Sequence, residues 1–415
     1  MNAPTQFSVL RFLPSLLALT AALLTALAVL PGCLGVLKFT HRFAATRAGA
    51  WFMYVGAIPL HIVATVMLAI ALIMARRSGA RWLVPGLATA SCVGVGVFGF
   101  FMHTGFMFRP VARPDYVTLD AAIARFGPKE TVVGVVDSRG LPYAYVARLA
   151  RRPHIVQQPE GPVPFMMSHC ILANSSMAYA VEPGTPPPRI SISSVIGNNL
   201  VFYDHDRHNT VQQIYNCAID GRDRLPVLTT VTTSLAAWRS LYPTSRVWVR
   251  QLEWRDAFYL KFLARGSVID PSSPDLVYPL QRPADPRLPL KSSVMGVQFG
   301  DSARAYPAEV LARARVTQEE IGGQPVVFFA SEDGEYVQLL SSQRPDGQGV
   351  LRFKLAPHGG HFLDEETGSI WDAAGRCSDG PLRGVQLAAI PHYSRIFWCV
   401  WADFFPHTSV FGQHR

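Results

Sequence analysis

Three apolar stretches, each long enough to cross a membrane, open the chain. They run from Phe12 to Val36, from Trp51 to Ala75 and from Trp82 to Phe108. Because about 20 apolar residues suffice to cross the hydrocarbon core, each stretch predicts a membrane-spanning helix. Trp51 and Trp82 begin their stretches, as residues that anchor a helix at the membrane surface do. We therefore expect a membrane domain of three helices over residues 1–110.

Two of these stretches allow further interpretations. The first could be a secretion signal, because Leu30-Pro-Gly-Cys33 resembles a lipoprotein cleavage box, although two further spans make a lipid anchor redundant. In the third, Gly86, Ala90 and Gly94 recur at every fourth position, a pattern that lets helices approach closely. It predicts contact with a neighbouring membrane protein; the alternative is flexible glycine in a single packed helix.

Charge excludes one large class of function. The net charge is +9, yet only 16% of residues are charged and no basic stripe is clustered along the sequence. Nucleic-acid binding needs such a stripe, so we expect no nucleic-acid partner, and membrane lipid is the expected one. The segments that flank the spans carry four lysine or arginine residues on one side of the membrane and five on the other, so the positive-inside rule does not orient the spans.

From about Val117 the sequence pattern changes to short apolar runs separated by turn residues. This pattern predicts an α+β, β-rich region. The expected strands are Thr131–Val136, Val163–Met167, Ser191–Ile196, Leu200–Tyr203, Val247–Leu252, Ser293–Phe299, Pro325–Phe329 and Leu351–Leu355. The expected short helices are Leu119–Arg125, Ala144–Arg151, Leu235–Leu241 and Pro307–Ala312.

This region also repeats itself. Trp238-Arg-Ser-Leu-Tyr-Pro243 matches Trp401-Ala-Asp-Phe-Phe-Pro406 at an offset of 163 residues. Val133-Gly-Val135 matches Met295-Gly-Val297 at an offset of 162. Similar offsets at distant sites predict one internal duplication. We expect two homologous β-rich lobes, over residues 117–281 and 282–415.

The motifs of this region resemble those of the bacterial and archaeal family called Domain of Unknown Function 3179 (DUF3179). The resemblance is carried by Asn199-Leu-Val-Phe-Tyr-Asp204, Asp285-Pro-Arg-Leu-Pro-Leu-Lys-Ser-Ser-Val-Met-Gly-Val297, Ala303-Arg-Ala-Tyr-Pro307, Ile321-Gly-Gly-Gln-Pro-Val326, Asp364-Glu-Glu-Thr-Gly-Ser-Ile-Trp371 and Gly380-Pro-Leu-Arg-Gly384. The resemblance implies no established activity. Its members often look exported or membrane-attached, which implies a bacterial inner-membrane protein with its soluble region on the periplasmic side.

The departures from the family pattern concern its cysteines and histidine. Members typically carry a Cys-Pro-Leu-Cys-Gly-Thr box, where this chain has Cys170-Ile-Leu-Ala-Asn-Ser175. The first cysteine remains and the second is Ala173. The family's upstream histidine corresponds to His154. In the stretch that matches the family's Gly-Glu-Ala-Ile, Cys217 replaces the acid.

Thiolate and imidazole ligands suit zinc or copper, so a metal site could form around Cys170 and His154. His169, Cys217 or His205 would have to complete its coordination. The alternative is that Cys170 is a buried, inert thiol and that His205 is a solvated turn residue. Two functions follow: a membrane-anchored, extracytoplasmic binding or assembly protein with a decayed family site, or a metal- or thiol-dependent redox enzyme that uses the remnant site.

Overall fold

The computed structural model describes residues 6–33, 40–78, 82–159, 163–182, 184–185, 188–218, 221, 224–357 and 360–413. The end of the first predicted span, residues 34–36, lies outside them. The fold is α+β, as the sequence predicts, and forms two compact units. The membrane unit comprises Met1–Arg109, Pro188–Ile196 and Leu200–Asp223, and the β-rich unit comprises Pro110–Pro187, Gly197–Asn199 and Arg224–Arg415.

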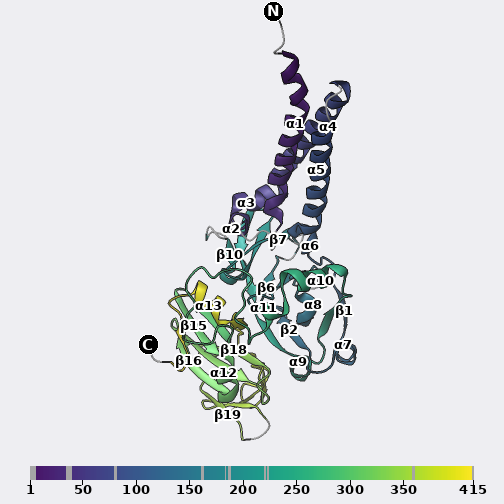
Figure 1. Cartoon of the computed structure of the whole chain (residues 1–415). Helices are drawn as coiled ribbons and strands as arrows, with labels where there is room; N and C mark the ends of the chain where they lie inside the picture. Colours follow the sequence, from purple (N-terminus) through teal and green to yellow (C-terminus); the bar gives the residue numbers. More distant parts are fainter. Residues whose placement is uncertain are drawn as a thin grey trace, which may run out of the picture. The chain divides into compact units, whose positions relative to one another are not determined.

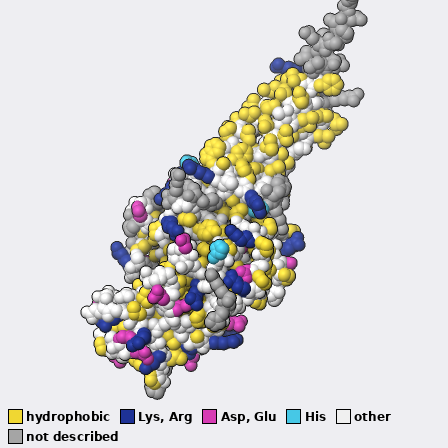
Figure 2. All heavy atoms as spheres, turned by 90° about the vertical axis from the view of Figure 1, so that its left-hand side faces the viewer, with side chains coloured by type: hydrophobic (Ala, Val, Ile, Leu, Met, Phe, Trp, Pro, Cys, Tyr) yellow, Lys and Arg dark blue, Asp and Glu magenta, His cyan; other side chains and the backbone are white. Residues whose placement is uncertain are grey.

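Three helices of the membrane unit are long and apolar enough to cross a membrane: Phe12–Gly32, Arg47–Arg77 and Leu83–Met102. This confirms the three predicted spans, the third ending earlier than the apolar stretch. The elements are α1 (Gln6–Val29), η1 (Leu30–Gly32), α2 (His41–Ala45), α3 (Arg47–Trp51), the π-helical turn η2 (Phe52–Gly56), α4 (Ala57–Ser78), α5 (Leu83–Met102) and α6 (Thr104–Met107). Hydrophobic side chains cover the visible outer surface of these helices (Figure 2).

Helix α1 packs against both α4 and α5 (Figure 1). Ala18, Ala71 and Ala88 are buried where the helices meet. Gly99 is required there, because an added Cβ would lie 2.2 Å from Cγ1 of Val29. The predicted Gly86–Gly94 stripe faces away from these contacts: a Cβ at either glycine would meet nothing within 4 Å. The stripe is therefore open on the chain itself.

A four-stranded sheet, ordered β10-β9-β8-β7, belongs to the membrane unit. Its strands are β7 (Ile190–Ile196), β8 (Asn199–Asp204), β9 (Asn209–Gln212) and β10 (Cys217–Ala218), with the 3-10 turn η3 (Gln213–Tyr215) before β10. Tyr54 holds it to the helices: its hydroxyl donates to the carbonyl of Ile192 at 2.7 Å, and its ring stacks on Tyr203 at 5.4 Å between centroids. These strands come from the stretch that the sequence assigns to the first repeat.

Five sheets build the β-rich unit. The first lobe holds β1-β13-β3-β2-β12 and β11-β6-β5-β4, and the second holds β23-β14-β15-β24, β16-β17-β18 and β19-β20-β21-β22. The strands of the first lobe are β1 (Asp115–Thr118), β2 (Thr131–Val136), β3 (Pro142–Val146), β4 (Ile155–Gln158), β5 (Phe165–Cys170), β6 (Ser175–Ala180), β11 (Val227–Leu228), β12 (Thr230–Ser234) and β13 (Arg246–Val249). Those of the second are β14 (Ser293–Phe299), β15 (Ser302–Pro307), β16 (Val316–Ile321), β17 (Gln324–Ala330), β18 (Val337–Ser341), β19 (Phe353–Leu355), β20 (Phe362–Asp364), β21 (Ile370–Trp371), β22 (Cys377–Asp379), β23 (Tyr393–Phe397) and β24 (Ser409–Val410). The helices of the unit are α7 (Leu119–Phe126), α8 (Ala147–Ala150), α9 (Leu235–Leu241), α10 (Trp254–Phe258), the π-helical turn η4 (Tyr259–Leu263), α11 (Gly266–Ile269), α12 (Ala308–Ala314) and α13 (Trp398–Phe404).

The predicted helix over Ala144–Arg151 is wrong for its first three residues. Ala144–Val146 belong to β3, and only Ala147–Ala150 form a helix. Strand β3 lies between β2 and β13: Tyr145 pairs with Val133 on one side and with Trp248 on the other. Burial in the middle of a sheet favours the strand for aromatic and β-branched residues, whatever the local helix pattern.

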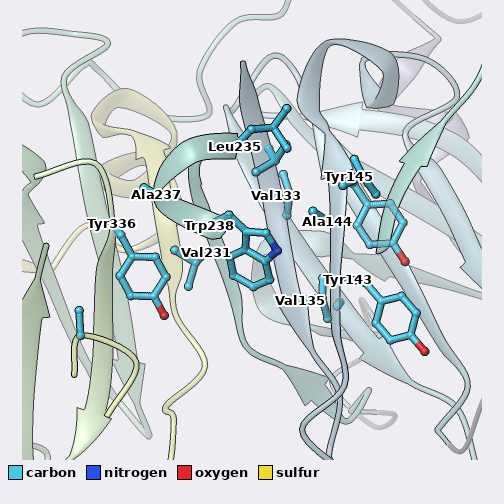
Figure 3. Packing of buried hydrophobic residues seen from close by; sticks show 14 of the residues in the cluster. Val133, Val135, Tyr143, Ala144, Tyr145, Val231, Leu235, Ala237, Trp238 and Tyr336 are labelled. Atoms are coloured by element: carbon cyan, nitrogen blue, oxygen red, sulfur yellow. The ribbon is translucent and has the colours of Figure 1, made fainter. Parts of the chain in front are cut away.

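Each lobe fixes a tryptophan on its central sheet in the same way. Trp238 packs against the strand that carries Val133 and Val135 (Figure 3), and a Cβ added at Gly134 of β2 would come within 2.2 Å of its indole. Trp401 lies over Gly296 of β14, with a corresponding approach of 2.4 Å. Both indole nitrogens donate at 2.9 Å to the hydroxyl seven residues later, on Ser245 and Thr408.

The two lobes also meet at matching positions. The N–H of Thr232 in β12 donates to Oγ of Ser394 in β23 at 3.0 Å, and these residues are 162 positions apart. Contact between equivalent positions is what an approximate two-fold axis produces. The duplication itself stays a prediction, which these correspondences support.

Candidate functional site

The residues of the remnant site lie on the paired strands β4 and β5. His154 precedes β4 with a positive φ of 72°, and its ring Nδ1 lies 2.9 Å from the carbonyl oxygen of His169. A carbonyl only accepts, so Nδ1 carries the proton. Burial lowers the pKa of His154 to about 4, which keeps the ring neutral at neutral pH.

His169 and Cys170 are buried as well. Burial, with the nearby charges of His154 and Arg151, lowers the pKa of His169 to about 3, and its Nδ1 lies 2.9 Å from Oγ of Ser176. The thiol of Cys170 donates to the carbonyl oxygen of Asn198 at 3.4 Å. The three residues therefore sit together in a packed region, each with a hydrogen-bond partner in the protein.

The other two predicted ligands, His205 and Cys217, belong to the membrane unit. His205 is not a solvated turn residue: it is half-buried, lies 3.0 Å from Oγ of Ser191 and packs edge-on against Tyr54. Cys217 pairs with Gln212 across β10 and β9. Within the described ranges, no three His, Cys, Asp or Glu side chains are grouped so that they could hold a metal ion.

The turn that carries the altered cysteine box connects the lobes. The carbonyl of Ala173 accepts from the N–H of Phe397 at 2.9 Å, and Nδ2 of Asn174 donates to the carbonyl of Arg395 at 2.7 Å. Positions at which the family typically has Cys-Gly thus contact β23 of the second lobe.

A cavity with a volume of about 680 Å³ lies between the two lobes. We call it the interlobe cleft. From the first lobe it is lined by Gly134, Val136, Asp137, Ser138, Gly140, Thr229, Val231, Trp238 and Tyr242, and from the second by Tyr336, Gln338, Ala374, Arg376, Cys377, Gly384, Gln386, Leu387, Ala388 and Ala389. The volume falls within the range of about 300–1,000 Å³ that is usual for small-molecule sites.

Asp137 lines the cleft, and one of its two carboxylate oxygens has no hydrogen-bond partner in the described protein. It follows β2, and its Oδ1 accepts from the backbone N–H groups of Arg139 and Leu141, both at 2.9 Å. Its Oδ2 is buried and has no hydrogen-bond partner in the described protein. The side chain is only 4% exposed. A buried acceptor without a partner is costly, and a donor from outside the protein, either a water molecule or a ligand, would satisfy it.

Tyr242 of the first lobe, with Tyr336 and Arg376 of the second, adds aromatic and polar groups to the lining. Burial raises the pKa of Tyr336 well above its usual value, with the neighbouring Tyr242 adding to the shift, so its hydroxyl stays protonated. That hydroxyl lies 3.3 Å from Oε1 of Gln338. The guanidinium of Arg376 lies 5.2 Å from the ring centroid of Tyr242 and donates to Asp372 at 2.8 Å. In Figure 3, Tyr336 comes from the second lobe and lies beyond Val231 from Trp238.

The groups that line the cleft are of the kinds that can hold a small polar molecule. The cleft offers one free anionic acceptor, neutral hydroxyl and amide groups, and aromatic surface. Its thiol, Cys377, donates to the carbonyl of Asp379 at 3.2 Å, and burial raises its pKa, so it is not an activated nucleophile. Sequence reasoning missed the cleft, because the stretch from Asp137 to Gly140 reads only as a turn. The available sequence signal for this region was Gly134, which corresponds to Gly296 in the match between the two repeats.

A second cavity, of about 280 Å³, is lined by Arg113, Pro114, Tyr116, Tyr143, Gln158, Pro159 and Arg246. It is more basic than the cleft. The hydroxyl of Tyr116 donates to Oε1 of Gln158 at 2.6 Å, so one wall is already hydrogen-bonded.

Comparison with known proteins identifies the family. Residues 109–408 match a family described as a protein of unknown function, DUF3179. The chain belongs to the DUF3179 family. The interlobe cleft, His154 and Cys170 all fall within the DUF3179 region, whereas the three membrane helices precede it. No curated protein and no solved structure was found to match the chain.

Proposed function

We propose that this DUF3179 protein is a membrane-anchored binding protein whose ligand occupies the interlobe cleft. The observation that carries the proposal is the buried, unpartnered Oδ2 of Asp137. A ligand that donates a hydrogen bond, from an ammonium, guanidinium or hydroxyl group, would satisfy it. The flanking Tyr336 and Gln338 would orient the rest of a small polar molecule.

Substitution of Asp137 by asparagine tests this with little disturbance of the turn. The amide oxygen of asparagine can take the place of Oδ1 and accept from Arg139 and Leu141. Its NH2 group then replaces Oδ2, which changes only the unpartnered atom from acceptor to donor. Asp346→Asn is the control: its Oδ1 accepts from the N–H of Gln348 at 3.0 Å in an exposed turn that does not line the cleft, and its carboxylate also pairs with Arg344 at 2.6 Å.

The measurement is the thermal shift of the full-length protein in detergent across a panel of organic ammonium, guanidinium and polyol compounds. A compound that raises the unfolding temperature of the wild type and of Asp346→Asn, but not of Asp137→Asn, supports the cleft as the binding site. Stabilisation that survives in Asp137→Asn contradicts it.

A second candidate is the metal- or thiol-dependent redox enzyme. It is favoured by the proximity of His154, His169 and Cys170 in one region of the first lobe. A zinc or copper ion there would need ligands beyond one thiolate and one imidazole. Metal analysis of the wild type, Cys170→Ala and His154→Ala decides it: stoichiometric metal that both variants lose would favour the enzyme.

We also propose that the membrane is the bacterial inner membrane, with the β-rich unit on the periplasmic side. The support is the exported character of members that the resemblance implies. Alkaline phosphatase fused after Gln413 would be active on that side, and a fluorescent protein there would be dark. The reverse result would place the unit in the cytoplasm.

The open Gly86–Gly94 stripe supports the proposed contact with a neighbouring membrane protein. Gly94→Leu would then remove a partner that co-purifies with the wild type, without loss of the folded chain. Retention of that partner would contradict the contact.

A further inference from the structure

An apolar face of the β-rich unit is exposed immediately after β13. Residues 252–263, called here the amphipathic segment, contain α10 and the turn η4. Leu252, Trp254 and Phe262 are 60%, 55% and 52% exposed. Single exposed apolar residues are ordinary, but three large ones on one short segment mark a surface that something covers.

The opposite face of this segment is fixed to the unit. Asp256 is buried and accepts from Nε of Arg152 at 2.8 Å and from Nη1 of Arg250 at 3.0 Å. Glu253 accepts from Nη2 of Arg152 at 3.1 Å. The ring of Tyr259 packs edge-on against His154 at 5.5 Å. The apolar residues therefore point outward from a segment held by buried ion pairs, and they are not a loose loop.

The charges beside the apolar face are basic. Lys261 and Arg265 are exposed, and Nζ of Lys261 lies 5.3 Å from the ring centroid of Phe262. The nearby acid, Glu253, accepts from Arg255 at 2.9 Å as well as from Arg152 at 3.1 Å. Aromatic residues with lysine and arginine at their edges are the composition of segments that lie in the interface of anionic membranes.

The covalent chain keeps this segment within reach of a membrane. Asp115 in β1 pairs with Val249 in β13, and the segment begins three residues after Val249. Asp115 is in turn only eight residues beyond Met107, the end of α6. An extended chain of that length spans at most about 28 Å. The third span ends at Met102, so the bilayer surface is the nearest apolar phase that the tether offers.

We propose that the amphipathic segment lies in the surface of the membrane that the three helices cross, with Trp254 and Phe262 at the boundary between headgroups and acyl chains. Segments of this kind insert about 5–10 Å. Lys261 and Arg265 then face anionic headgroups. This contact is independent of the ligand proposed for the interlobe cleft, and it would fix the β-rich unit at a second point on the membrane.

Spin-label accessibility on the full-length protein in lipid nanodiscs tests the proposal. Cys33, Cys170, Cys377 and Cys399 are buried, so serine at the half-buried Cys92 and Cys217 gives a background for single labels. Labels go at Trp254→Cys and Phe262→Cys, with Leu252→Cys as a third position should one variant fail to fold. Val350→Cys and Leu355→Cys are the controls, because each is an apolar residue 44% exposed in the second lobe.

The expected result is a several-fold higher ratio of oxygen to nickel-chelate accessibility at the segment than at the controls, in nanodiscs that contain anionic lipid. Equal, water-like ratios at all positions would overturn the proposal. Labels at the segment that are shielded from both reagents would also overturn it, since a second copy of the chain or another protein would then cover the face.

Discussion

Two buried aspartates should respond in opposite directions to the same substitution. Asp137 has one oxygen bonded and one without a partner. Asp364 is equally buried, yet all its acceptors are used: its Oδ1 accepts from the N–H of Thr367, and its Oδ2 from Oγ1 of Thr367 and Nε1 of Trp371, the latter two at 2.9 Å. We therefore expect Asp137→Asn to stabilise the ligand-free protein and Asp364→Asn to destabilise it.

The magnitudes follow from what each amide leaves unpaired. In Asp137→Asn a buried, unpartnered charged oxygen becomes a neutral NH2 group, still unpartnered, so the gain is about 1 kcal/mol. In Asp364→Asn an NH2 group must face at least one donor, and charge-assisted hydrogen bonds are lost, so the cost is about 2–4 kcal/mol. For a unit of this size, each kcal/mol shifts the unfolding temperature by about 2–4 °C.

Thermal unfolding of the detergent-solubilised protein without ligand, followed by circular dichroism in the far ultraviolet, measures both effects. Asp137→Asn should unfold about 2–4 °C above the wild type, and Asp364→Asn several degrees below it. If Asp137→Asn falls as far as Asp364→Asn, then Oδ2 of Asp137 has a structural partner and the reasoning that makes it a ligand anchor is refuted. Stability gained where binding is lost is the usual trade-off at a binding site.

Two further predictions concern burial. Burial lowers the pKa of His392 from 6.5 to about 4, so the unfolded state binds a proton first as the pH falls. On this account the free energy of unfolding should drop by about 3 kcal/mol between pH 7.5 and 4. Denaturant unfolding of His392→Gln should show a smaller drop over this range, and a drop equal to that of the wild type would contradict the prediction. Gly134→Ala and Gly296→Ala should each destabilise the protein by about 1–3 kcal/mol, because the new methyl group would overlap the indole of Trp238 or Trp401; a loss in only one of the two would argue against equivalent packing in the lobes.

The sequence predicts what depends on local pattern. The strands Thr131–Val136 and Ser293–Phe299 and the helix Leu235–Leu241 have the predicted bounds, since each is a short apolar run bounded by turn residues. The predictions fail where contacts with segments distant in the sequence determine the secondary structure. Ala144–Val146 form a strand because two other strands flank them.

The candidate site escapes sequence reasoning for the same reason. Asp137 and Tyr336 are almost 200 positions apart and become neighbours of one cavity only when the lobes pack. The exposed Trp254 likewise looks like a core residue in sequence, and only the buried Asp256 on the other side of the segment reveals which face is turned outward. By contrast, the grouping of His154 with Cys170 follows from a hairpin, a local structure.

Strands β8 and β9 in the first predicted repeat, and β20 and β21 in the second, each form a small antiparallel meander. The two meanders differ in sequence where they contact different neighbours. In the second lobe, Trp371 of β21 donates to Asp364 at the end of β20. Asp204, 160 positions earlier, ends β8 in the same way, but the position of the tryptophan holds Val211, and Oδ2 of Asp204 accepts instead from Arg207 at 3.0 Å.

The meander without the tryptophan is the one that belongs to the membrane unit. There the aromatic anchor is Tyr203 of β8, whose ring lies almost parallel to that of Tyr54, with 2° between the planes, where the second lobe has Leu363. Aromatic pairs of this kind add to the area that each ring buries. Val211, at the position that corresponds to Trp371, thus belongs to a sheet whose aromatic contact is made to a membrane helix. The aromatic residue therefore occupies a different position in each sheet: Tyr203 packs on Tyr54 in one, and Trp371 donates to Asp364 in the other.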